Sequence, residues 1–173
     1  KKIDSIKVDA RTVNDVKVSQ DGTIAIISRE GASNRKNGIF ILDVTNPYDV
    51  KVLSEYTKNL NGGVHNLFID NDHAYVLGTG ERYYILNIED PTNPVEVGMF
   101  EVGREGQNIH DVWIEDGIAY SSNWRDGVYL VDVGNGIAGG SPSNPVPFSN
   151  YTYASGANHA AFPFRSKSTG TFY

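Results

Sequence analysis

The sequence predicts an all-β fold built as a run of β-propeller blades. Three observations predict it: a pattern that recurs after 51, 45 and 49 residues, four strand signals in each copy, and a composition with 18 glycines and 10 tyrosines. Propeller blades of four strands have periods of about 40–50 residues. No segment spaces its apolar residues by three and four, which excludes stacked helix pairs. We therefore expect about three and a half four-stranded antiparallel blades that belong to a larger ring.

Each copy begins with a short apolar or alternating strand and continues into a tight turn. The copies start near Asn14, His65, His110 and His159, and their turns are of the Asp-Gly or Asn-Asp kind that closes a β-hairpin. The whole chain, residues 1–173, is then one propeller segment. We expect blades at residues 14–60, 61–107 and 108–157, a partial blade at 158–173, and the last strand of a preceding blade at 1–10.

The third strand of each copy has the most regular sequence. It is an apolar run that ends at Asp43, Asn87 or Asp132, and in the first two copies an Asn-Pro turn follows within a few residues. Proline ends the strand because it fixes φ and lacks an N–H donor. We expect the three side chains to accept backbone hydrogen bonds in these turns. A catalytic carboxylate pair would instead require two of them within about 5–10 Å.

This third-strand pattern resembles the LVIVD repeat, in which an apolar run and Val-Asp-Val precede Ser/Thr-Asn-Pro. Residues 41–47 match the repeat best and residues 85–91 come next, whereas in the third copy a glycine-rich insertion separates Val133 from Asn144 and Pro145. The resemblance covers nearly the whole chain. It implies a β-propeller from an exported bacterial or archaeal protein, and it defines the fold better than the function.

Composition excludes several classes of function. The net charge is −6 and the 15 basic residues are scattered, so nucleic acid is not expected as a partner. The chain has no cysteine, which removes disulfides, zinc thiolate sites and cysteine nucleophiles. No apolar stretch approaches the roughly 18 residues that a transmembrane helix needs. Together with the resemblance, the turn-rich composition favours a secreted protein, extracellular or periplasmic.

Three of the four histidines share one repeat position. His65, His110 and His159 open the first strand of their copies, and Asn14 opens the first copy. First strands lie nearest a propeller's axis, so these imidazoles are candidates to meet at one mouth of the channel and hold a divalent transition metal. The structural alternative is that each side chain bonds a carbonyl of the neighbouring blade. This alternative is favoured, and no cofactor is firmly implied.

A second group of candidates would contact a ligand or partner. Some follow the histidines or open a copy, and the others lie in loops between second and third strands, where a Trp-Arg pair has the composition of a binding hot spot. The alternative for the tryptophan is packing between blades. The candidates are Asn14, Asn66, Asp111, Arg82, Trp124 and Arg125.

Catalytic motifs are absent from the sequence. It contains no G-x-S-x-G, H-E-x-x-H, P-loop, G-x-G-x-x-G or EF-hand pattern. The favoured hypothesis is a non-catalytic scaffold or binding module of an exported protein, with a protein, cell-surface or glycan partner, within a larger chain or assembly. The alternative is a metal-dependent enzyme or metal-binding protein that uses the phased histidines.

Overall fold

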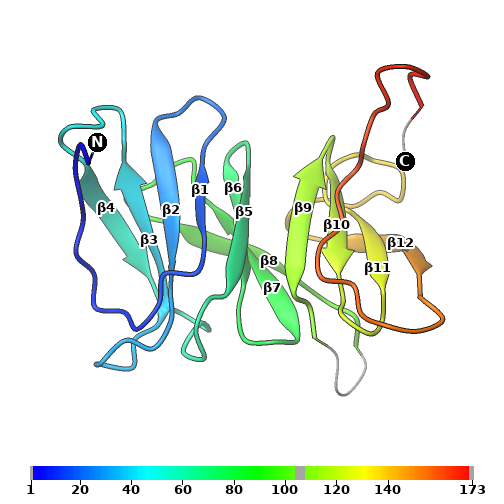
Figure 1. The fold of residues 1–173 in the computed structure, drawn as a ribbon, viewed down its shortest axis with the longest axis horizontal. Coiled ribbons are helices and arrows are strands. Elements are labelled where there is room, and N and C mark those ends of the chain that lie inside the picture. Colours follow the sequence, from blue (N-terminus) through cyan, green and yellow to red (C-terminus); the bar gives the residue numbers. More distant parts are fainter. Residues whose placement is uncertain (1, 104–107, 172–173) are drawn as a thin grey trace.

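The computed structural model describes residues 2–103 and 108–171. Within them the chain forms twelve β-strands and no helix, arranged as three four-stranded antiparallel sheets (Figure 1). This confirms the prediction of an all-β chain with four-stranded antiparallel sheets.

The strands follow one another through each sheet in chain order. The first sheet contains β1 (Val16–Val18), β2 (Ile24–Arg29), β3 (Gly38–Asp43) and β4 (Lys51–Tyr56). The second contains β5 (Asn66–Asp70), β6 (His73–Leu77), β7 (Arg82–Asn87) and β8 (Val95–Glu101). The third contains β9 (Asp111–Glu115), β10 (Ile118–Ser122), β11 (Val128–Asp132) and β12 (Val146–Tyr151).

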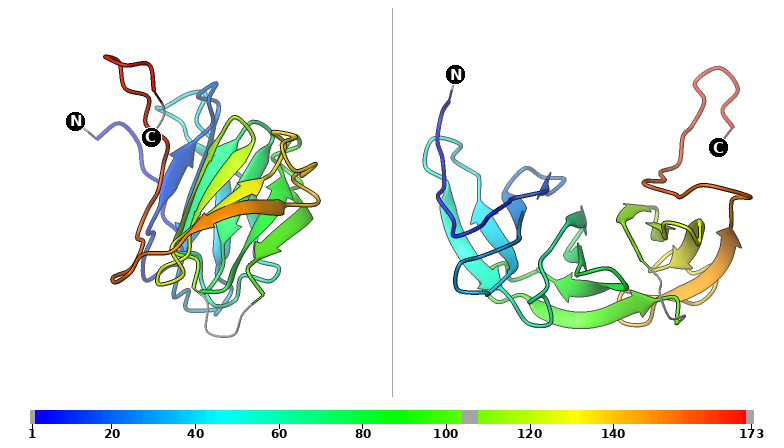
Figure 2. Two further views of the ribbon diagram at one scale, coloured as in Figure 1. Left: turned by 90° about the vertical axis from the view of Figure 1, so that its right-hand side faces the viewer. Right: turned by 60° about the horizontal axis from the view of Figure 1, so that its bottom comes forward.

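The sheets stand side by side in an arc. Figure 2 shows the first strands β1, β5 and β9 on its inner side and β4, β8 and β12 on its outer side. β5 lies between β1 and β9 and contacts both. The chain therefore crosses each sheet from the inside to the outside and returns to the inside to begin the next.

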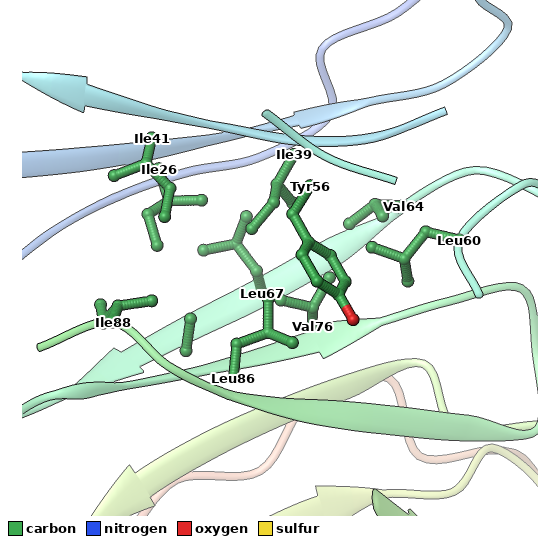
Figure 3. Close-up of a cluster of buried hydrophobic side chains, with 11 residues drawn as sticks. Ile26, Ile39, Ile41, Tyr56, Leu60, Val64, Leu67, Val76, Leu86 and Ile88 are labelled. Atoms are coloured by element: carbon green, nitrogen blue, oxygen red, sulfur yellow. The ribbon is translucent and has the colours of Figure 1, made fainter. Parts of the chain in front are cut away.

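Two hydrophobic clusters join the sheets because alternate residues of a strand point to opposite faces. Ile26 and Ile39 of the first sheet pack with Leu67 and Leu86 of the second (Figure 3). The opposite face of the second sheet packs on the third through a cluster that includes Tyr75, Tyr83, Val112 and Val131. The second sheet is thus covered by apolar contacts on both faces.

The turns follow the local sequence. Asp116 and Gly117 have φ values of 51° and 70° and close the hairpin of β9 and β10, as expected for an Asp-Gly turn. After the third strands, the side-chain oxygens of Asp43 and Asn87 accept the N–H groups of Thr45 and Glu89 at 2.9 and 3.1 Å. The predicted role in the turns is confirmed for both.

Asp132 shows what the glycine-rich insertion does. The side chain is fully buried, and it accepts N–H groups from Gly134, Gly136, Ala138 and Gly140 at 2.7–3.1 Å. Burial by itself would raise the pKa of this carboxyl group, but the four amides outweigh it and hold the pKa well below its usual range. The insertion therefore folds around one carboxylate.

Two segments form no strand where the sequence predicts one. Residues 2–10 make no strand; instead, the carboxylates of Asp4 and Asp9 accept the N–H groups of Val50 and Ser33 in the first sheet's loops. Residues 158–171 form isolated bridges only. A strand requires a partner strand along its edge, and neither segment has one among the described residues. The last two residues of the predicted partial blade, 172 and 173, lie outside the described residues.

The part of the chain that the structure describes contains no helix with the length and hydropathy needed to cross a membrane.

Candidate ligand-binding groove

The chain enters each new copy through the same backbone contact. The residue before each histidine donates its N–H to a carbonyl at the end of the preceding sheet's second strand or in the loop after it. The pairs are Val64 with Arg29 at 3.3 Å, Ile109 with Gly80 at 2.6 Å, and Asn158 with Trp124 at 2.7 Å. This repeated bond fixes the place of each histidine relative to the sheet before it.

The three phased histidines consequently form a row, which we call the histidine row. The ring centroids of His65 and His110 lie 5.1 Å apart, and those of His110 and His159 lie 4.0 Å apart. Nδ1 of His110 is 3.0 Å from the carbonyl oxygen of His159, so this imidazole bonds the backbone of the next copy. Burial lowers the pKa of His110, and positive charge on either neighbouring imidazole lowers it further. The bond to the carbonyl and the negative charge of Asp111 act in the opposite direction.

Trp124, in the β10–β11 loop, packs against this row. Its ring centroid lies 4.9 Å from that of His110 and 5.9 Å from that of His159, and the side chain is half-buried. Its backbone has a φ of 49°, which is uncommon for a large side chain and marks a constrained turn. The ring therefore packs between successive copies, while Arg125 beside it is exposed.

Metal binding at the histidine row stays a prediction. In residues 2–103 and 108–171, no three histidine, aspartate or glutamate side chains are placed so that they form a metal-ion group.

Polar side chains one residue further along form a belt across the inner strands. Asn66 Nδ2 donates to Asp111 Oδ1 at 2.7 Å, which links the second sheet to the third. Asp15 Oδ2 accepts the N–H of Leu67 at 3.0 Å, which links the first sheet to the second. The ammonium group of Lys17 pairs with Asp15 at 2.6 Å. These bonds give Asn66 and Asp111 a structural role in joining the sheets.

An aromatic row lies two residues beyond this belt, on the same face of the strands. The ring centroid of Trp113 is 4.9 Å from that of Phe68 and 5.8 Å from that of Phe162. Trp113 is 38% exposed and Phe162 is 63% exposed. Our sequence reasoning missed these residues, although the shared repeat position of Phe68, Trp113 and Phe162 carried the signal.

The histidine row, the polar belt and the aromatic row line one groove of about 420 Å³ on the inner side of the arc. A second cavity, of about 620 Å³, opens beside the β6–β7 loop, and its lining includes His65, His110, Glu30 and Glu81. The two histidines border both spaces. Concave sites with apolar walls and a few polar groups are typical of ligand-binding sites.

The other predicted contact residues lie at the margin of this groove or outside it. Asn14 lines its end and donates through its amide to Glu30. Arg82 lies away from the groove and pairs with Glu101 of β8 at 2.9 Å. Arg125 borders a separate cavity with Trp124 and Tyr153.

The sequence matches no protein-family model, and no curated protein is significantly similar to it.

Proposed function

We propose that the three sheets are consecutive blades of a β-propeller related to the LVIVD-repeat proteins, and that the chain is a non-catalytic binding module. The strand order supports the propeller, because each sheet runs from an inner first strand to an outer fourth strand. The resemblance of residues 41–47 supports the family and, with it, an exported protein that is extracellular or periplasmic.

The observation that carries the binding function is the inner groove. Four successive copies contribute imidazole, polar and aromatic side chains to it, and Trp113 keeps more than a third of its surface exposed there. Exposed tryptophan in a concave setting is typical of binding hot spots. A protein or cell-surface glycan partner would contact this wall.

Arrays of peptides and of glycans, probed with the purified labelled chain, test this function. We expect a reproducible set of bound probes that Trp113→Ala abolishes. Tyr151→Ala is the matched control, because Tyr151 is 67% exposed on the outermost strand of the same sheet and lies outside the groove lining. Binding that survives Trp113→Ala, or no binding to either array, would contradict the proposal.

Metal binding is the second candidate function, favoured by the close spacing of the three imidazole rings. It predicts stoichiometric transition metal by elemental analysis of the purified protein and its loss when His65, His110 and His159 are replaced by alanine. Metal-free protein after incubation with Zn²⁺, Cu²⁺ or Ni²⁺ would eliminate this candidate.

A further inference from the structure

The charges in the groove leave one carboxylate without a cation. Lys17 and Asp15 neutralise each other at 2.6 Å. Asp111 is half-buried and makes no ion pair within residues 2–103 and 108–171; its Oδ1 accepts from Asn66 Nδ2 and from the N–H of Val112, which are both neutral donors. A partly buried carboxylate that forms no direct ion pair favours a cation beside it.

The charged form of the His110 imidazole is disfavoured at this position. Burial lowers the pKa of His110, the imidazole next to Asp111, below its ordinary value. Burial also raises the pKa of Asp111, and the attraction of Lys17 and His110 opposes this rise only in part. An anionic ligand would increase the cost of burying this charge, whereas a cationic ligand would reduce it.

The aromatic row supplies a wall of the right kind beside this carboxylate. The rings of Phe68 and Phe162 are tilted by 55° and 48° from the plane of Trp113. The three rings are therefore not coplanar and form no continuous flat platform on which a sugar ring would stack. Trp has the strongest attraction for a cation among the aromatic side chains.

We propose that the groove binds an organic ammonium group, which would lie against Trp113 with Asp111 as its counter-ion. The ligand class comprises methylated amines and lysine-like side chains of a partner. This inference rests on the proposed binding function and names the chemistry of its ligand.

Titration with tetramethylammonium chloride tests the proposal, with the ionic strength held constant by NaCl. The chain has two tryptophans, so its NMR spectrum has two indole N–H signals, and Trp113→Phe identifies the one from Trp113. We expect this signal to shift saturably. Tert-butanol, a neutral molecule of similar shape, should bind at least about tenfold more weakly.

Asp111→Asn is the decisive variant. It removes the charge but keeps the oxygen that accepts from Asn66 and Val112, and we expect about tenfold weaker binding of tetramethylammonium. Asp116→Asn is the matched control: it removes one charge from the exposed turn after the same strand, and its effect should stay within about twofold because of screening.

Three results would overturn the ammonium proposal: equal binding of tert-butanol, equal affinity of the two asparagine variants, or a shift of the Trp113 signal by methyl glucoside but not by tetramethylammonium. If array binding depends on Trp113 while tetramethylammonium does not bind, the binding function stands and the ammonium proposal fails. If array binding does not depend on Trp113 either, both fail.

Discussion

Val16 and Val112 occupy the same repeat position and have opposite surroundings. Val112 of β9 is 2% exposed and packs in the cluster between the second and third sheets, whereas Val16 of β1 is 55% exposed. Leu67, their counterpart in β5, is fully buried against the first sheet. The preceding sheet therefore supplies the burial at this position. Position 16 carries an apolar residue because it belongs to the repeat, although its side chain is exposed.

The largest expected effect tests this contrast directly. Val112→Ala removes two buried methyl groups and should lower the free energy of unfolding by about 2 kcal/mol. The same substitution at Val16 should change it by less than about 0.5 kcal/mol. Urea unfolding of both variants, followed by circular dichroism, measures the two values. Equal losses would mean that the face of the first sheet that points away from the second sheet is covered in solution.

A second contrast between equivalent positions involves Asp43 and Asp132. Among the described residues, Asp43 accepts hydrogen bonds only from the N–H and hydroxyl of Thr45, whereas fully buried Asp132 accepts four backbone amides. Asparagine is a natural residue at this position, as Asn87 shows. Asp132→Asn should lower the urea midpoint at least about twice as much as Asp43→Asn. It weakens four charge-assisted bonds to buried amides and places an NH2 group where Oδ2 accepted two N–H groups, whereas Asp43→Asn affects only the bonds from Thr45.

The stability of the wild type and that of Asp132→Asn should depend differently on pH in acid. The pKa of Asp132 is lowered in the folded protein, so its contribution is fully present above the unfolded value of about 3.9 and is lost as pH falls toward the folded pKa. The wild type should lose stability more steeply than Asp132→Asn between about pH 4 and pH 2. If the free energies of unfolding of the two proteins fall in parallel with pH, the amides do not stabilise the carboxylate form of Asp132.

The sequence pattern predicted those elements whose hydrogen-bond partners lie only a few residues apart in the chain. The Asp-Gly hairpin and the turns after Asp43 and Asn87 are set by three or four residues, so they were predictable. Residues 2–10 and 158–171 have strand-like sequences but form no strand, since a ladder requires a neighbour that local sequence does not specify.

The candidate site was predictable only in part. The period placed His65, His110 and His159 in one row, because a shared repeat position in adjacent sheets implies proximity. The aromatic row was missed because the exposed fraction of Trp113 depends on how far apart the inner strands lie. Arg82 was included through loop equivalence; it pairs with Glu101 on the neighbouring strand, away from the groove, and its contact with a partner stays a prediction.

The smallest expected effect is on the pH dependence of stability, and it concerns His110 and Asn14, which hold the same repeat position in different copies. Burial lowers the folded pKa of His110 below the unfolded value of about 6.5, so the unfolded state binds more protons in between. Stability should therefore rise with pH across the window between the folded pKa and about 6.5. His110→Asn introduces the residue that the first copy carries at this position, and it should flatten this slope. The control His73→Asn, on β6, should leave the contribution of His110 unchanged. An NMR titration in which His110 ionises at or above about 6.5 would contradict this prediction, because it would mean that the carbonyl of His159 and the charge of Asp111 together outweigh burial.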